Sequence, residues 1–475
     1  MLESFDEWFA VRDGHDDDRI WPGRLSFSIK NGVVLEAIAF PDGGNFYQAP
    51  NCDTGTITGY LDYQRPTTII NPWVQSRGGG SMGVDTPVVR SKARIIGSAI
   101  LKNIHLTDIN ERCFTGVSMD LPAFSSWYAP RIVKTDFSFP NDKGPADVSV
   151  DVDRPEHSEF VLNDQTKVTI DSYAHPATEG AVTSVTQRTS LWFQFSEAAN
   201  YEAVIKRIWR VNILFSFLLG HRMAQSPYHL HTTHTRSWNE EDRPVVAELL
   251  FRPTFKSKTE HLEWHDALFT RHNCTLDARS ILNAAAEQPD ALFYLMNMVL
   301  LMEHPKKLSA NTFSEFMGCV EDFDQTVFGS GSSSDLKALR KSLKKVVAEH
   351  GSEADKRTLG DLLHRSPNRY SLAQRVERLQ RAWLDSGFRE SPDPIELVKL
   401  RNAISHGRAV TLEVDDYQKM VWFGYYLCAL SRFHIFRELG LPDEDIGEAF
   451  CRVPYRYGMY APRTEEATNA EAETK

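Results

Sequence analysis

The first 195 residues alternate between apolar and polar side chains, a pattern typical of β-strands with one buried face. Leu25, Phe27 and Ile29 have polar neighbours, and a second apolar run follows Asn31-Gly32, which predicts a hairpin. Further strand-like runs lie at 67–74, 93–106, 113–119, 167–170 and 189–195. We therefore expect an antiparallel sandwich or barrel-like domain at 1–195, with a role in sensing or recruitment.

The periodicity becomes helical at about residue 196, where apolar side chains begin to recur every three or four residues. The first such run consists of Tyr201, Val204, Ile208, Val211 and Phe215. Other helical runs lie at 260–268, 276–287, 290–302 and 313–328. The pattern predicts a helical middle region at 196–328.

A bundle of helices is expected at 329–460, after a glycine- and serine-rich stretch that is typical of a linker. Within it, Ser371 and Gln374 have the spacing of a capping box, and Asp415 is expected to begin a long last helix. Short connections favour antiparallel helices, which is why a bundle is the expected arrangement.

The expected fold class is α+β, with a β-rich amino-terminal domain followed by an all-α region. The end at 461–475 is acidic and alanine-rich, and we expect it to be disordered. A loop is expected at 77–83; its glycines lack the Gly-Lys-Ser/Thr ending of a phosphate-binding loop, so it is given no nucleotide role.

The helix with the most informative side chains begins near Asp393, which can cap it, and Pro394 suits its first position. Glu396 stands where it would complete a capping box, and Gly407 is suited to follow the last turn.

The spacing within this helix separates an apolar side from a polar side. At about 100° per residue, Leu397, Leu400 and Ile404 share one side, while Asn402 and His406 lie on roughly the opposite side. His406 is therefore expected to point away from the core. The preceding Arg401 lies about 140° from His406 on this wheel, so it either swings round or acts on a partner's groove.

Arg401, Asn402 and His406 suit the cleavage of RNA without a metal ion. That reaction needs a base, an acid and positive charge beside the phosphorane-like transition state. A histidine exchanges protons near neutral pH, and an arginine presents a planar set of donors to phosphate. Because one histidine per chain leaves one role empty, two chains related by a two-fold axis are the economical solution.

The string from Arg401 to His406 matches the signature of HEPN ribonucleases, and the layout of the whole chain resembles the ApeA-like HEPN anti-phage proteins. The resemblance implies a homodimer or higher even oligomer, with both motifs lining one groove. It also implies cleavage of RNA, with tRNA as one candidate, to 2′,3′-cyclic phosphate ends, after a phage-derived trigger. In this reading Arg401 stabilises phosphorane charge, His406 transfers protons and Asn402 orients the histidine or the phosphate. No cofactor is expected.

Two alternatives stand beside the catalytic interpretation. A motif of this kind arises by chance in roughly one chain in ten of this length, and Asn402 and His406 would then merely stabilise the last helical turn. The alternative of another class is a catalytically silent HEPN scaffold that binds RNA or protein, because a fold alone does not decide function.

A rival constellation of metal-ligand side chains lies between residues 229 and 274. It comprises His229, His231 and His234, then His261, Glu263 and His265, and finally His272 and Cys274. Imidazoles at such spacings can hold zinc, but HLEWH is not HExxH and no CxxC accompanies it. Structural histidines are the better interpretation, so no metal site is assigned.

Composition narrows the class of protein. With 475 residues, 41% of them hydrophobic, the chain can form two or three domains. Its longest apolar runs are too short to span a membrane, its start resembles no secretory signal, and its six cysteines form no CxxC pair. These features predict a cytoplasmic protein without membrane partners.

Charge is unevenly distributed along the chain. The net charge is −11, yet 331–410 holds 16 Lys or Arg against 10 Asp or Glu, a local excess of +6. Such a basic module can draw a polyanion to one place. For each single arginine, the solvated face of an ordinary helix is the simpler interpretation. The arginines in question are Arg365, Arg369, Arg375, Arg378 and Arg381.

Overall fold

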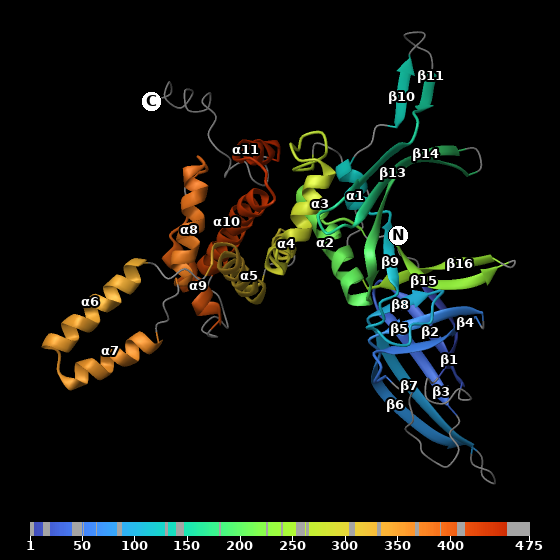
Figure 1. Ribbon diagram of the computed structural model, residues 1–475, viewed down its shortest axis with the longest axis horizontal. Helices are drawn as coiled ribbons and strands as arrows, with labels where there is room; N and C mark the ends of the chain where they lie inside the picture. Colours follow the sequence, from blue (N-terminus) through green and yellow to red (C-terminus); the bar gives the residue numbers. More distant parts are fainter. Residues whose placement is uncertain are drawn as a thin grey trace. The chain divides into compact units, whose positions relative to one another are not determined.

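The chain forms two compact units, Met1–Trp264 and His265–Lys475, each of which is considered by itself. The computed structural model (Figure 1) describes residues 4–12, 20–39, 50, 52–62, 64–82, 88–128, 132–138, 147–179, 182–224, 227–238, 241–252, 262, 266–303, 309–329, 334–365, 370–389, 391–405 and 414–453. The expected boundary at 195/196 lies inside the first unit, and the expected tail at 461–475 lies outside the described residues.

A 14-stranded antiparallel sheet dominates the first unit. Its order is β12-β13-β14-β9-β15-β16-β8-β5-β4-β1-β2-β3-β7-β6. The strands are β1 (Phe5–Arg12), β2 (Ile20–Ser28), β3 (Gly32–Ala39), β4 (Thr56–Leu61), β5 (Arg65–Ile70), β6 (Trp73–Met82), β7 (Val88–Gly97), β8 (Ala99–Lys102), β9 (Phe114–Met119), β12 (Glu156–Val161), β13 (Lys167–Glu179), β14 (Val182–Ala199), β15 (Tyr228–Trp238) and β16 (Glu241–Phe251). A separate hairpin pairs β10 (Val133–Ser138) with β11 (Asp147–Val152).

The predicted hairpin at Asn31-Gly32 is confirmed. Strands β2 and β3 pair with Phe27 opposite Val33, and Gly32 adopts a positive φ of 73°, a conformation that glycine tolerates without strain. Leu25, Phe27, Val33 and their alternating neighbours are buried in one apolar cluster. The alternation seen in the sequence therefore identifies the buried face of these strands.

The glycine-rich stretch expected as a loop at 77–83 belongs largely to strand β6, so that expectation was wrong. Residues up to Met82 pair with β7, from Arg77 opposite Ala93 to Met82 opposite Val88. Backbone hydrogen bonds to the neighbouring strand form this edge of the sheet, and glycines offer no side-chain alternation that would reveal it.

Two helices accompany the second half of the sheet. Helix α1 (Pro122–Tyr128) packs against α2 (Tyr201–Leu219), with the Phe124 and Phe215 rings 4.8 Å apart. Helix α2 confirms the periodicity that begins at 196. The chain then returns to the sheet as β15 and β16, inside the segment expected to be helical, because pairing with β9 and β8 extends both strands.

The second unit is helical. Its helices are α3 (Ala278–Glu287), α4 (Asp290–Met302), α5 (Ala310–Phe328), α6 (Ser334–His350), α7 (Glu353–Arg365), α8 (Leu372–Asp385), α9 (Pro394–Ser405), α10 (Val414–Glu438) and α11 (Asp443–Arg452). Helix α10 packs against α4, α5, α8, α9 and α11, while α6 and α7 pack on each other (Figure 1). None of the helices in the described ranges is long and apolar enough to cross a membrane.

The core of this bundle surrounds Trp383 on α8. Its ring lies 4.4 Å from that of Phe388 and 5.5 Å from that of Phe433, and its Nε1 donates to the Arg389 backbone oxygen at 2.8 Å. The predicted capping box is confirmed: Ser371 and Gln374 each accept a hydrogen bond from the other's backbone amide. Local sequence signals thus place α8 correctly.

Buried ion pairs join the helices. Asp324 on α5 is fully buried and accepts from Arg375 at 3.2 Å and from Arg378 at 3.0 and 2.5 Å. Arg432 on α10, also buried, forms two hydrogen bonds with Glu303 at 2.7 and 2.6 Å. Arg375 is therefore not part of a solvated basic face, which corrects the sequence interpretation.

Replacement of Asp324 by asparagine is expected to lower the free energy of unfolding by about 3 to 5 kcal/mol, because it removes the fully buried counter-charge that Arg375 and Arg378 share and leaves Arg375 only the Glu321 carboxylate at 3.9 Å. The matched control is Asp322→Asn, an exposed carboxylate on the same helix, with an expected change within about 0.5 kcal/mol. Urea unfolding followed by circular dichroism measures both changes, and equal effects would contradict the structural role of Asp324.

His434 makes the stability of the bundle depend on pH. Its Nε2 donates to the Leu379 backbone oxygen at 2.9 Å, and burial lowers the pKa of His434 from 6.5 to about 4. Between these two values the unfolded chain binds the proton and the folded chain does not, so stability present above pH 6.5 is lost as the pH falls towards 4.

The expected loss between pH 7 and pH 5 that is due to this group is about 2 kcal/mol. Urea unfolding of the wild type and of His434→Gln at several pH values measures it, because the glutamine has no proton to gain. Wild-type and variant stabilities that fall in parallel over this range would show that His434 is not responsible.

Candidate functional site

Helix α9 presents one side to the bundle and another to solvent. Leu397, Leu400 and Ile404 are buried, and the helix packs against α5, α8 and α10. Asn402 and Ser405 are exposed on the other side. The predicted cap is confirmed, since the Asp393 carboxylate accepts from the Ile395 amide at 2.8 Å. The sequence wheel therefore gave the correct orientation of this helix.

Arg401 and Asn402 lie in contact near the end of α9. Arg401 is half-buried, and its Nη1 donates to Asn402 Oδ1 at 3.2 Å. The Nε of Arg401 is buried and has no hydrogen-bond partner within the described part of the chain. The guanidinium is thus turned towards the exposed Asn402 through Nη1, while its Nε is enclosed.

In the described part of the bundle, five other arginines face carboxylates. The pairs are Arg375 and Arg378 with Asp324, Arg381 with Glu377, Arg432 with Glu303 and Arg437 with Asp443. Among the described residues, no carboxylate forms an ion pair with Arg401. Within these residues no carboxylate cancels its charge, unlike the charges of the paired arginines above.

The third residue of the predicted site, His406, lies outside the described residues, as does Gly407. The structure therefore brings Arg401 and Asn402 together, and it leaves the position of His406 as a prediction. Ser405, the last residue of α9, is exposed, and its hydroxyl lies 2.8 Å from that of Ser314 on α5. A hydroxyl partner supplies no general base, so a nucleophilic role for Ser405 has no support.

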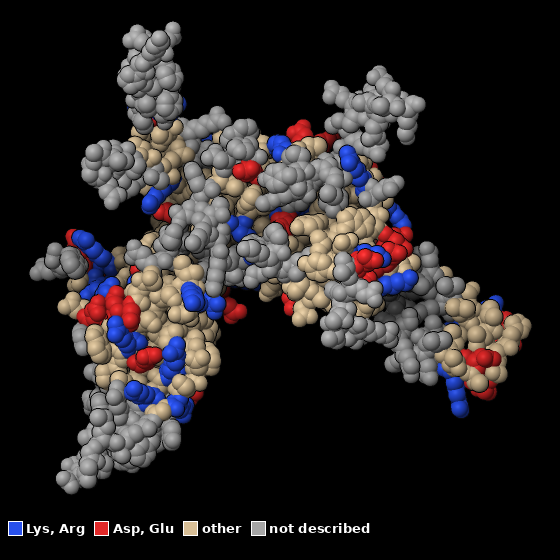
Figure 2. Space-filling view, turned by 180° about the vertical axis from the view of Figure 1, so that it is seen from behind, with Lys and Arg blue, Asp and Glu red and all other residues tan. Residues whose placement is uncertain are grey.

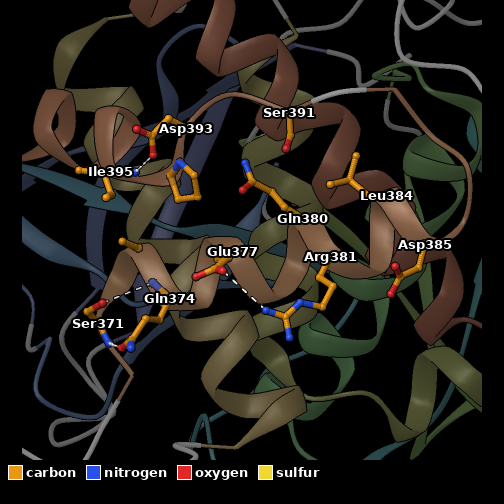
Figure 3. Close-up of a pocket in the computed structure, with 12 residues that line it drawn as sticks. Ser371, Gln374, Glu377, Gln380, Arg381, Leu384, Asp385, Ser391, Asp393 and Ile395 are labelled. Carbon is orange, nitrogen blue, oxygen red and sulfur yellow. Dashed lines mark hydrogen bonds and ion pairs between the residues drawn. The ribbon is translucent and has the colours of Figure 1, made fainter.

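A pocket of about 700 Å³ lies between α8 and the start of α9 (Figure 3). Its lining includes Gln374, Glu377 and Arg381 of α8, Asp393 just before α9, and Ile395 of α9. Arg401 and Asn402 are absent from its lining and stand about two turns further along α9. This pocket is therefore separate from the candidate site.

Within the described ranges, the side chains proposed from the sequence as an alternative metal set form no group of three with ligand atoms close together. His229, His231 and His234 all lie on β15 in the first unit, whereas His272 and Cys274 belong to the second. His231 contacts Ser118 at 3.1 Å and the Trp192 ring at 5.3 Å, and burial lowers the pKa of His231. His261, Glu263 and His265 lie outside the described residues.

His234 instead meets two residues that the sequence analysis did not select. Its Nε2 lies 2.8 Å from Glu111 Oε1, and the Cys113 thiol lies beside both side chains. Burial, and after it the Glu111 charge, raises the pKa of the Cys113 thiol to about 12. The free thiol is therefore neutral and is not an activated nucleophile.

Surface charge in the structure is finely mixed. Figure 2 shows basic and acidic side chains next to one another on the coloured part of this face. Surface pairs such as Arg24 with Asp6 at 2.7 Å and Arg94 with Glu36 at 3.2 Å illustrate the mixture. Paired charges cancel much of the long-range attraction for a polyanion.

Comparison with known families gives two matches. A family model described as ApeA N-terminal domain 1 matches residues 7–284, more than half of the chain. A second, described as Apea-like HEPN, matches residues 315–445, a range that includes α9 and the motif at its end. No curated protein and no solved structure shows a significant match.

Proposed function

Because the chain belongs to the ApeA family of anti-phage HEPN proteins, we propose that it is an endoribonuclease that cleaves RNA without a metal ion. The observation that carries the proposal is the set of contacts that the Arg401 side chain makes. Its guanidinium is hydrogen-bonded to an exposed asparagine and lacks a carboxylate partner among the described residues.

In the proposed reaction the chain's own side chains perform every step. Arg401 binds the scissile phosphate and stabilises the charge that grows on its oxygens. His406 removes the proton of the ribose 2′-hydroxyl or protonates the leaving 5′-oxygen, and Asn402 orients the phosphate or the imidazole. The contact between Arg401 and Asn402 supports the first of the two alternatives for Arg401, in which its side chain swings round to the polar side of α9.

A second copy of the chain supplies the missing half of the site. Acid and base catalysis in one step needs two proton-transferring groups, and each chain offers one motif histidine. We therefore propose a homodimer, or a higher even oligomer, in which two motifs line one groove. In this proposal the first unit senses a phage-derived trigger. The candidate substrate is tRNA.

His406→Ala is expected to lower the rate of RNA cleavage by at least about 100-fold, because it removes the proton-transferring group. Arg401→Lys is expected to lower the cleavage rate to a similar extent, because an ammonium group does not reproduce the planar donors of a guanidinium. The measurement is cleavage of total RNA or tRNA by the purified proteins, together with toxicity in cells.

Matched controls are His350→Ala and Arg381→Lys, which change an exposed histidine on α6 and an exposed arginine on α8. Both should keep wild-type activity, and thermal unfolding should show that all four variants fold. A fully active His406→Ala protein would refute the assignment. Tight RNA binding by the triggered wild type without fragments would favour the scaffold alternative.

Cleavage is expected to persist when EDTA is added, because the proposed acid, base and phosphate-binding groups are side chains. The measurement compares the initial cleavage rates of one protein preparation in a buffer with EDTA and in the same buffer with Mg²⁺. Rates within about two-fold agree with side-chain catalysis, whereas strict dependence on Mg²⁺ would indicate metal-assisted hydrolysis.

A further inference from the structure

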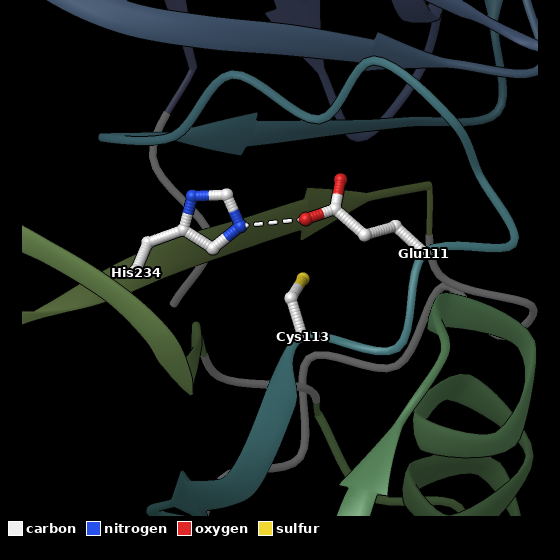
Figure 4. Close-up of side chains that lie close together, drawn as sticks. All are labelled: Glu111, Cys113 and His234. Atoms are coloured by element: carbon white, nitrogen blue, oxygen red, sulfur yellow. Dashed lines mark hydrogen bonds and ion pairs between the residues drawn. The ribbon is translucent and has the colours of Figure 1, made fainter.

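Three metal-binding side chains of the first unit point into one space. Figure 4 shows the carboxylate of Glu111, the thiol of Cys113 and the imidazole of His234 facing one another. Their ligand atoms all lie within 4.8 Å of one another, and the imidazole and carboxylate are 2.8 Å apart. The residues come from two segments that are more than 100 positions apart in the sequence, so their meeting is a product of the fold.

The backbone holds both segments in place. The Thr233 amide, next to His234, donates to the Cys113 backbone oxygen at 2.7 Å. Arg112, between the other two ligands, donates from Nε to the Ala198 backbone oxygen at 2.9 Å and pairs with Glu197 at 3.2 Å. The side chains of Glu111 and Cys113 are therefore presented from a fixed stretch of chain.

A break in the strand pairing turns His234 towards this stretch. The register of β15 shifts against β9 between His231 and Thr232, and against β16 between His231 and Thr235. Such bulges re-aim side chains, and they commonly stand beside functional sites. Without the shift, the regular alternation of the strand would decide which face His234 occupies.

We propose that Glu111, Cys113 and His234 bind a Zn²⁺ ion in the first unit. Thiolate sulfur, imidazole nitrogen and carboxylate oxygen are the three donor types that zinc accepts, and three protein ligands leave a fourth tetrahedral position for water. The mixture of a soft donor with nitrogen and oxygen does not suit Mg²⁺ or Ca²⁺, which bind oxygen ligands.

The distances require only small adjustments. Bonds to zinc of about 2.0 to 2.3 Å hold neighbouring ligand atoms roughly 3.3 to 3.7 Å apart. The imidazole and carboxylate, 2.8 Å apart, would separate slightly, and the thiol sulfur already lies within 4.8 Å of both ligand atoms. Glu111 and His234 have side chains that are 34% and 35% exposed, so both can turn, and the ion can enter from solvent. Cys113 is almost fully buried and supplies the fixed ligand.

Zinc at this place would tie the segment before β9 to the middle of β15. A site of this kind links binding of the metal to folding of the segments that carry the ligands. Metal release would remove this cross-link, while the backbone hydrogen bond between Thr233 and Cys113 would remain. The inference concerns the first unit and does not depend on the ribonuclease activity of the second.

The test uses the full chain, freed of metal by a chelator and then titrated with Zn²⁺ or Co²⁺ alone. About one zinc per chain is expected to remain after desalting, and Co²⁺ is expected to give the intense visible absorption of a tetrahedral site with a thiolate-to-metal band. Cys113→Ser should abolish the thiolate band and weaken zinc binding by at least about 10-fold, and His234→Gln should weaken it similarly.

The matched controls are Cys319→Ser, a half-buried thiol in the second unit, and His231→Gln, another imidazole on β15. Both should keep the wild-type stoichiometry and spectrum, and circular dichroism shows whether each variant folds. Retention of zinc by folded Cys113→Ser and His234→Gln proteins would place the metal elsewhere and overturn the proposal. A wild-type chain without bound zinc and without the thiolate band would equally overturn it, leaving a hydrogen-bonded pair beside a buried thiol.

Discussion

The buried carboxylate of Asp324 is the contact on which the geometry of the candidate site depends. It joins α5 to α8 through Arg375 and Arg378, and α9 lies against both helices. Because the apolar side of α9 packs against α5 and α8, the opposite side of α9 faces solvent. Asn402 is exposed for this reason, and Arg401 is left half-buried at the edge, where its guanidinium can turn outward.

Two kinds of arginine therefore occur in the same bundle. Arg375 and Arg432 are enclosed and neutralised by carboxylates, so their charge serves packing and is closed to ligands. Arg401 has a neutral amide as its observed partner, which orients the guanidinium without cancelling its charge. The proposed phosphate binding at the end of α9 rests on that difference rather than on the number of basic residues in the segment.

The sequence predicted those parts of the molecule that depend on neighbours along the chain. The hairpin at Gly32, the capping box at Ser371 and the polar side of α9 follow from turn chemistry and periodicity, and each was confirmed. The polar contact between Arg401 and Asn402 also lies within one helical turn. His406 stays a prediction, because it lies outside the described residues.

Features that depend on distant pairing were missed. Strands β15 and β16 form because they pair with β9 and β8, which come from a distant part of the chain. The glycines of β6 pair with β7, and they have no side chains whose alternation would indicate a strand. Arg375 looked like a surface residue because its partner Asp324 is 51 positions away. The cluster of Glu111, Cys113 and His234 also forms by contact between segments that are far apart in the sequence. Its residues form no motif with a recognisable spacing, so no sequence signal indicates the cluster.

The chemical form of the RNA ends tests the central claim most directly. Attack by the ribose 2′-hydroxyl, which is the reaction that an arginine and two histidines can catalyse without a metal, produces a 2′,3′-cyclic phosphate and a 5′-hydroxyl. Mass spectrometry of fragments released from tRNA by the triggered protein should show these ends. Fragments with 5′-phosphate and 3′-hydroxyl ends would show that water attacks the phosphate, and would contradict the assignment of Arg401, Asn402 and His406.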